Sequence, residues 1–348
     1  MTGFDSLTKK LDQEIRGVTP GLKVQAFSKG AKVYEAEVGE TYRYYDWASL
    51  TKVVFSVSAL MKAFESRMFD PFEKVNTYVS DFPFETVCAN HLLTHSAGFQ
   101  WWQAFYEHID LSLPPSERFK QVLEMIYQEP EPTPNEKSVY SDLDFLVLGR
   151  LLESIYQTSL IDIWQRLNSE LELESVHFNL NNVPSFDPKL YAPTESCAWR
   201  GRVLQGEVHD ENTWALGGVS AHAGLFGTID DLAKWGLLIR SAYFNDSASG
   251  FEHETVALFT RRSISVDKGD WALGFMMPTP GKASCGDRFS AESFGHTGFT
   301  GTSIWLDPKK DLLICILSNR VFPTRDNKKF VELRPRIHNW ISDTIESS

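Results

Sequence analysis

The chain has 348 residues, of which 42% are apolar and 13% aromatic, and its formal net charge is −12. This length allows one large domain or two ordinary ones with a sizeable core. The acidic excess argues against a nucleic-acid partner, and no window reaches the ~18 continuous apolar residues of a membrane span. We therefore expect a soluble globular protein without nucleic-acid or membrane partners. The sequence leaves the oligomeric state open.

Two features indicate the compartment. Residues 1–17 contain no apolar h-region and no small-residue cleavage site, so this segment is not predicted to be a secretory signal. The cysteines lie far apart and form no CxxC pair; they are Cys88, Cys197, Cys285 and Cys315. This usage favours a reducing compartment, and we predict the cytoplasm.

The first elements in chain order are a short helix and a hairpin. Residues 22–30 and 31–40 alternate in the manner of strands, with Lys29-Gly30 as the turn between them. Residues 46–52, DWASLTK, follow and lead into the run VVFSVSALMKAF. A run that is apolar on every side predicts a helix that is buried on every side.

Ser49 and Lys52 lie at the N-terminal end of that predicted helix. Positions i and i+3 share a helix face, so Ser49 Oγ and Lys52 Nζ are expected to meet. Burial would lower the pKa of the lysine, and a neutral amine can take the hydroxyl proton, which makes the serine a nucleophile. N-capping is the alternative role for such a serine.

The same S-x-x-K spacing occurs at Ser6/Lys9 and at Ser265/Lys268. Ser6 opens a polar amphipathic segment, where an N-cap is expected, and Ser265 lies among charged residues. Ser49 alone leads into a buried helix. The context therefore favours Ser49 as the catalytic serine.

The middle of the chain reads as helices joined by loops. Residues 91–99 predict a short helix ending at Gly98, and residues 141–156 an amphipathic helix with Ser141 as N-cap. Residues 129–135 form a proline-rich loop. The later predicted elements are a helix at 159–173, long loops at 180–215, a helix at 230–244, strands at 271–277, 293–307 and 311–320, and a final helix at 330–345.

Strands at both ends and helices in the middle indicate an α+β fold. We expect one antiparallel sheet flanked by helices, with an inserted, mostly helical region. The predicted domains are a discontinuous sheet domain, residues 1–75 and 215–348, and a mostly helical domain, residues 76–214. The active site is expected between them.

Two further stretches hold candidate site residues. Tyr140 precedes a helix, and a cation beside a buried tyrosine favours tyrosinate, which could act as a base or proton shuttle; an aromatic staple is the alternative. His296-Thr297-Gly298 lies in a predicted strand, where glycine suggests close approach by a backbone or ligand. Such an edge could bind a substrate amide, or the glycines could simply permit a hairpin.

The three stretches read SLTK, YSD and HTG, and in this order they resemble the serine β-lactamase and penicillin-binding family. The resemblance is nearest to its class C-like branch of DD-peptidases, family VIII esterases and muropeptide amidases, and it covers nearly the whole chain. HLLTHSAGF at 91–99 is similar to a segment common in that branch. Residues 208–235, 296–308 and 318–327 look most like N-acetylmuramoyl-L-alanine amidases of muropeptide recycling.

The resemblance implies a β-lactamase/DD-peptidase-like fold and a mechanism without a cofactor. Ser49 would be the nucleophile of an acyl-enzyme, with Lys52 and Tyr140 sharing the proton transfers; which of the two is the resting base stays open. The backbone N–H groups of Ser49 and Phe299 would form the oxyanion hole.

The substrate-binding residues implied by the resemblance are His296, Thr297, Gly298 and Asp142. Asp142 stands where many relatives have asparagine, so an amide donor to the substrate is lost. His296 stands where class C β-lactamases have lysine, which argues against β-lactamase activity as the primary role. We favour a neutral His296, because the nearby Lys52 would lower its pKa; a histidine cation that holds a substrate carboxylate is the alternative.

The expected function is that of a serine hydrolase acting on a small-molecule or peptide substrate. The resemblance favours cleavage of an amide or peptide bond in peptidoglycan-derived muropeptides, of the N-acetylmuramoyl-L-alanine amidase or D-Ala carboxypeptidase type. A carboxylesterase of small acyl esters is one alternative. An inactive relative that serves as a binding module is another.

Two residue groups remain outside this mechanism. His209, Asp210 and His222 suggest a metal, but their spacing fits no standard zinc pattern, so no metal is predicted and hydrogen bonding within a loop or to substrate is expected instead. Trp101 and Trp102 could stack on a sugar or pack in the interior.

Overall fold

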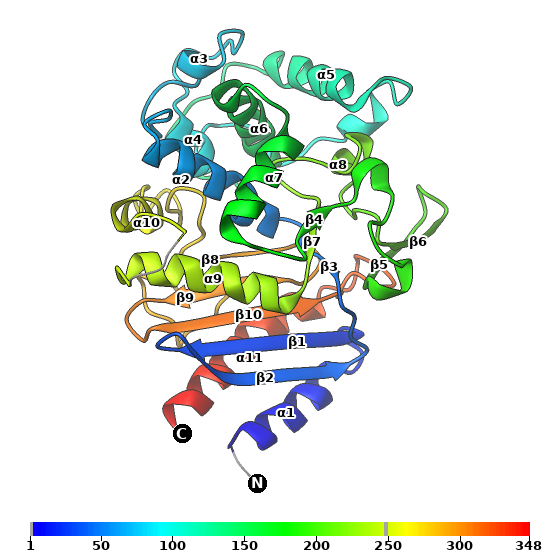
Figure 1. Cartoon of the computed structure of the whole chain (residues 1–348), viewed down its shortest axis with the longest axis vertical. Coiled ribbons are helices and arrows are strands. Elements are labelled where there is room, and N and C mark those ends of the chain that lie inside the picture. The colour runs from blue at the N-terminus through cyan, green and yellow to red at the C-terminus, as the bar shows by residue number, and fades with distance from the viewer. Residues whose placement is uncertain (1–2, 247–249) are drawn as a thin grey trace.

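The computed structural model describes residues 3–246 and 250–348, and Figure 1 shows a sheet below and a helical region above it. The main sheet is antiparallel, in the order β2-β1-β10-β9-β8. The strands are β1 (Gly21–Ser28), β2 (Ala31–Gly39), β3 (Tyr45–Asp46), β4 (His177–Phe178), β5 (Pro193–Cys197), β6 (Arg202–Gln205), β7 (Leu225–Gly227), β8 (Phe294–Thr297), β9 (Ser303–Asp307) and β10 (Leu312–Ser318).

Helices cover both faces of this sheet. In Figure 1, α1 and α11 lie against the lower face and α9 against the upper one. The α-helices are α1 (Gly3–Glu14), α2 (Ser58–Glu65), α3 (Val75–Tyr78), α4 (Ala89–Leu93), α5 (Pro115–Tyr127), α6 (Asp142–Tyr156), α7 (Leu160–Leu171), α8 (Glu211–Ala215), α9 (Ile229–Tyr243), α10 (His253–Thr260) and α11 (Lys329–Glu346). Short helical turns are η1 (Lys52–Val57), η2 (Phe105–Glu107), η3 (Leu180–Asn182) and η4 (Pro188–Leu190).

The alternation along β10 explains the two layers. Ile314 and Ile316 belong to the core beneath α1 and α11, whereas Leu313, Cys315 and Leu317 belong to the larger core shared with α9 and the helical region. Side chains on a strand point alternately to opposite faces, so an entirely apolar strand fits a sheet covered on both sides.

Several predicted elements are confirmed. The hairpin turn falls at Lys29-Gly30, where both residues have positive φ, 52° and 78°, as a two-residue hairpin loop requires. Helix α6 begins where predicted, and its N-cap Ser141 accepts hydrogen bonds from the backbone N–H groups of Leu143 and Asp144. The α+β fold with an antiparallel sheet is likewise as expected.

Other predicted elements are wrong. Helix α4 ends at Leu93 and not at Gly98, because the chain reverses at His95, whose φ is 52°. Residues 271–277 form isolated bridges rather than a strand, and residues 180–215 contain the hairpin β5–β6 and helix α8 rather than loops alone. Short elements of this kind are specified by tertiary contacts more than by local periodicity.

The domain boundaries at residues 75/76 and 214/215 stay a prediction. Within the part of the chain that the structure describes, no helix has the length and apolar character to cross a membrane.

Candidate active site

The segment before Ser49 is a tight turn held by Asp46 at the end of β3. Asp46 Oδ1 accepts the Ala48 N–H at 2.8 Å, and its Oδ2 accepts the His209 N–H at 2.7 Å. Ala48 has φ 48°, which is unusual for a residue with a Cβ and costs about 1 kcal/mol or more. Such strained backbone persists where the surroundings fix it, and here it sets the position of Ser49.

The helix after Ser49 is wound unusually. Its segment η1 is a π-helix, and all six of its side chains, including Lys52, are buried. Ser58 Oγ bonds the carbonyl of Val53, five residues earlier, at 3.0 Å. π-turns are rare and occur frequently at functional sites. This winding was not predicted.

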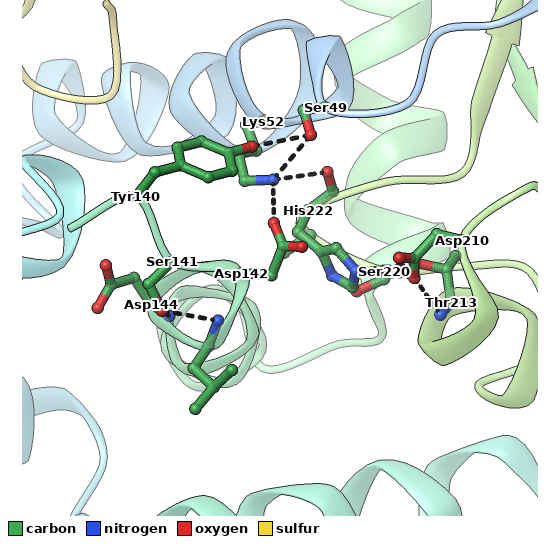
Figure 2. Close-up of polar contacts among 12 residues, drawn as sticks. Ser49, Lys52, Tyr140, Ser141, Asp142, Asp144, Asp210, Thr213, Ser220 and His222 are labelled. Atoms are coloured by element: carbon green, nitrogen blue, oxygen red, sulfur yellow. Dashed lines mark hydrogen bonds and ion pairs between the residues drawn. The ribbon is translucent and has the colours of Figure 1, made fainter. Parts of the chain in front are cut away.

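Ser49, Lys52 and Tyr140 meet as the sequence predicted (Figure 2). Lys52 Nζ lies 3.2 Å from Ser49 Oγ, and the Tyr140 hydroxyl donates to Ser49 Oγ at 2.8 Å. The first two residues come from the turn and helix after β3, and Tyr140 comes from the loop before α6. Because both neighbours hold Ser49 Oγ by donating to it, the lone pairs of this oxygen are oriented by the protein.

The charge of Lys52 differs from the expectation. Burial opposes the charged form, but the carboxylate of Asp142, together with Tyr140, raises the pKa of Lys52 above its usual value. Lys52 Nζ donates to Asp142 Oδ1 at 2.7 Å, to the carbonyl of His222 at 3.2 Å, and to Ser49. All three ammonium protons are thus engaged, and the expectation of a lowered lysine pKa is wrong.

Tyr140 is also protonated at rest. Burial raises the pKa of its hydroxyl, and Lys52 offsets this only in part. The expected tyrosinate is therefore not the resting form. The ring of Tyr140 lies 4.7 Å from that of His95 and is stacked on Trp271 at 5.9 Å. These contacts fix the direction of the hydroxyl.

His95 holds the loop segment that carries Tyr140. Its carbonyl accepts the Val139 N–H at 2.8 Å, and its Nδ1 accepts the Ser141 N–H at 3.1 Å. Nδ1 also lies 2.9 Å from Asp144 Oδ2. Burial lowers the pKa of His95 and raises that of Asp144, so the pair is neutral. No role was predicted for His95 or Asp144, although His95 lies in the HLLTHSAGF motif.

The His-Thr-Gly strand β8 approaches the nucleophile turn closely. Thr300 Oγ1 donates to the Asp46 carbonyl at 2.7 Å, and Thr302 Oγ1 donates to the Trp47 carbonyl at 3.1 Å. A Cβ on Gly298 would lie 2.5 Å from the Trp47 carbonyl oxygen. Glycine is therefore required at 298 because another backbone passes there, as the strand glycine suggested.

The two N–H groups proposed for an oxyanion hole are available. Among the described residues, no protein acceptor takes the N–H of Ser49 or of Phe299. Phe299 follows Gly298 at the turn, and its side chain is 47% exposed. Unpaired N–H groups on rigid backbone beside a nucleophile can stabilise a developing oxyanion.

His296 is buried behind the site. Burial and the charge of Lys52 lower its pKa to about 3, so the imidazole is neutral, as expected. Its Nδ1 lies 2.9 Å from the Thr297 carbonyl, and its ring is 6.0 Å from that of Tyr140. Thr297 is half-buried, with its hydroxyl 3.8 Å from Met276 Sδ.

Of the three residues of the possible metal group, Asp210 and His222 stay together and His209 lies apart. His209 turns its ring to Glu195, 2.9 Å away. Asp142, Asp210 and His222 instead gather with their ligand atoms within 4.8 Å of one another; we call them the carboxylate–histidine cluster.

Each member of this cluster already has a partner. Asp142 pairs with Lys52, and Asp210 pairs with His222 at 3.0 Å. Burial opposes the charge of Asp210, but His222 holds its pKa well below the usual range. A metal ion here would compete with the Lys52 ammonium for Asp142. The cluster therefore provides the carboxylate groups that lie beside this lysine (Figure 2).

Sequence reasoning also missed the role of Asp46 and the pairing of Asp142 with Lys52. Asp46 forms a side-chain turn with Ala48 and could have been recognised as an Asx-turn residue. The pairing of Asp142 with Lys52 joins positions 90 residues apart, and no local pattern reports it.

Comparisons with known proteins identify the family of this chain. A family model described as Beta-lactamase matches residues 4–334. A protein of Salmonella agona (strain SL483) named "Putative D-alanyl-D-alanine carboxypeptidase" is 32% identical over 342 residues, covering 87% of this chain and 77% of its own.

Two solved structures show the same fold. EstCE1, described as "a hydrolase with promiscuous acyltransferase activity", superposes with a TM-score of 0.74 at 17% identity, covering 99% of this chain and 98% of its own. The octameric penicillin-binding protein homologue from Pyrococcus abyssi gives a TM-score of 0.70 at 19% identity, covering 94% of this chain and 77% of its own. The chain therefore belongs to the β-lactamase family and is a serine hydrolase.

Proposed function

We propose that the enzyme forms an acyl-enzyme at Ser49 and cleaves an amide or peptide bond in peptidoglycan-derived muropeptides. The carboxypeptidase name of the Salmonella relative supports a D-Ala carboxypeptidase, with N-acetylmuramoyl-L-alanine amidase as the other form of the same chemistry. The observation that carries the proposal is the contact of Ser49 Oγ with Lys52 at 3.2 Å and with Tyr140 at 2.8 Å.

The proposed reaction has two steps. Ser49 Oγ adds to the carbonyl carbon while its proton passes to the Lys52–Tyr140 pair, and the leaving amine takes this proton as the C–N bond breaks. Water then adds to the acyl carbon and gives a proton to the same pair, the ester bond between this carbon and Ser49 Oγ breaks, and the pair returns the proton to Ser49 Oγ as the acid product leaves. The N–H groups of Ser49 and Phe299 would hold the oxyanion, typically worth about 3 kcal/mol each.

The resting protonation states impose a condition on this scheme. Lys52 and Tyr140 both hold a proton at rest, so one of them must lose it before the pair can accept that of Ser49. Activity should therefore rise with pH. Asp142, which raises the pKa of both groups, sets where the rise occurs.

Substrate positioning follows from the edge strand. We propose that Thr297, the last residue of β8, and Gly298, which follows it, bind the substrate backbone in strand fashion. His296 would act from behind as a neutral support for this strand and for Tyr140. Asp142 would contribute as counter-ion of Lys52 and not as a donor to substrate.

A second candidate, an ester hydrolase, is favoured by one observation. His296 is neutral and 1% exposed, so it offers no cation for a substrate carboxylate. Comparing kcat/KM on p-nitrophenyl butyrate with that on MurNAc-tripeptide distinguishes the two functions.

The experiment that tests the proposal is mass spectrometry of a muropeptide mixture after incubation with wild type and Ser49→Ala. We expect loss of D-alanine, or separation of sugar from peptide, with wild type alone. Peptide mapping after phosphonate treatment should find the adduct on Ser49. An adduct on the exposed Ser6 or Ser265, or products from Ser49→Ala, would refute the assignment.

We also propose that the enzyme works in the cytoplasm. The support is that all four cysteines are free thiols, as is usual in a reducing compartment. Fractionation of cells that express the native gene would test this.

A further inference from the structure

Exposed aromatic rings lie beside the catalytic centre, and the mechanism above does not use them. Trp101 is 64% exposed and Trp199 44% exposed. Trp101 stacks on Trp102 with 5.8 Å between ring centroids, Trp102 lies 6.4 Å from Tyr106, and Tyr106 lies 4.5 Å from Trp199. We call these four residues the aromatic strip. Packing does not account for it, because its two ends face solvent.

The backbone of the aromatic strip is hydrogen-bonded to residues of the active site. The Trp101 carbonyl accepts the N–H of Asp142, the partner of Lys52, at 3.0 Å. Farther along, the Tyr106 N–H donates to Asn212 Oδ1 at 3.1 Å. Asn212 lies in α8, whose N-cap is Asp210 of the carboxylate–histidine cluster. Hydrogen bonds therefore tie the backbone of the strip to Asp142 and to α8, which carry the residues around Lys52 and His222.

Charged groups border the rings. Burial and Glu107 raise the pKa of Tyr106 to about 12, with Glu211 and Arg325 also acting on it. Arg325 is 35% exposed and donates to Glu211. The exposed Glu107 accepts a hydrogen bond from the Tyr106 hydroxyl at 3.0 Å. The strip is thus an apolar surface with hydrogen-bonding groups along its edge.

We propose that the aromatic strip is a sugar-binding subsite that holds a pyranose ring of the substrate. A pyranose has an apolar C–H face that can lie on an indole, and a rim of hydroxyls that can bond to charged side chains. A plain aliphatic chain would cover those charged groups without replacing their hydrogen bonds to water, which costs free energy. The inference rests on the proposed function for the peptide attached to the sugar.

Direct binding tests the subsite without turnover. Ser49→Ala protein would be titrated with tri-N-acetylchitotriose by calorimetry and by saturation-transfer NMR. We expect saturable binding, weakened about threefold to tenfold when either Trp101→Ala or Trp199→Ala is added, as loss of one aromatic contact implies. Trp101→Phe should retain most of the affinity. Phe72→Ala, which removes another exposed aromatic side chain, 53% exposed, is the matched control and should bind normally.

Kinetics then connect the subsite to the substrate. The ratio of kcat/KM for a glycosylated peptide to that for the same peptide without sugar should fall in Trp101→Ala and stay constant in Phe72→Ala. Absence of saturable sugar binding, or a ratio that Trp101→Ala leaves unchanged, would overturn the inference. So would a preference for longer acyl esters that disappears in Trp101→Ala, which would indicate an aliphatic occupant. If wild type cleaves neither peptide, the proposed function fails, and the titration still decides the subsite.

Discussion

Replacement of Asp142 by asparagine should move the pH dependence of the enzyme to lower pH. Asp142 Oδ1 lies 2.7 Å from Lys52 Nζ, and the lysine side chain is 0% exposed. The carboxylate raises the pKa of both Lys52 and Tyr140. The prediction therefore holds whichever of the two accepts the proton of Ser49.

The size of the effect follows from the geometry. Two unit charges 4 Å apart interact by about 4 kcal/mol at an effective dielectric constant of about 20, and removing an opposite charge at such range shifts titration by about one to three pH units. Asparagine has the shape of aspartate, and its Oδ1 can still accept from Lys52. The ascending limb of kcat/KM should therefore move down by about one to three pH units in Asp142→Asn.

The assay is a pH profile of kcat/KM on an uncharged ester, with circular dichroism to verify folding. Glu292→Gln is the matched control, since Glu292 pairs with Lys309 at 3.5 Å and both side chains are more than half exposed; its profile should match wild type. A limb that stays in place or moves to higher pH in Asp142→Asn would refute the reasoning. Inactivity at every pH would also refute it, because Asp142 would then be a proton carrier itself.

Three other outcomes are expected. Tyr140→Phe removes the donor to Ser49 and should lower kcat about 10²- to 10⁴-fold; a loss below threefold would exclude Tyr140 from proton transfer. Burial lowers the pKa of His296 to about 3 and of His338 to about 4 in the folded protein. Below pH ~6.5 the unfolded chain therefore binds more protons than the folded protein. The free energy of unfolding should fall by up to about 1.4 kcal/mol per histidine for each pH unit below that value. Denaturant titrations at pH 7, 6 and 5 measure this, and equal stability at all three would contradict it. EDTA should leave activity intact, because Asp142 already pairs with the Lys52 ammonium and Asp210 with His222; activity lost with EDTA and restored by zinc would show that a metal acts there.

Local spacing was enough to predict part of the site. Ser49 and Lys52 are three residues apart on one helix, so their contact follows from helix geometry. The protonation state of Lys52 could not be predicted in the same way, because the lysine pKa depends on Asp142, the first residue of α6, which lies 90 residues away in the sequence. Burial was anticipated correctly, and the compensating charge reversed its effect.

The elements of the fold likewise divide into those that local sequence signals predict and those that depend on residues far away in the sequence. The hairpin β1–β2 and the helix α6 carry turn and cap signals in their own residues. The β5–β6 hairpin carries weak signals, and its pairing includes a register shift between Pro193 and Ser196. The π-turn of η1 likewise depends on the surroundings of the helix, where Ser56 Oγ bonds the carbonyl of Ala221 at 2.6 Å.

The pairing of β1 with β10 constrains how the protein can be made. Leu22 of β1 pairs with Ser318 of the central strand β10, so β1 stays without this neighbour until residue 318 has left the ribosome. Much of the contact between strands is non-local in sequence, which slows folding and leaves strand edges open to association. The ends of α1 and α11 lie together (Figure 1), with a Cβ on Gly3 only 3.4 Å from Thr344. Joining these ends and opening the chain elsewhere would make β8 to β2 one continuous stretch, so that the sheet could assemble early in synthesis.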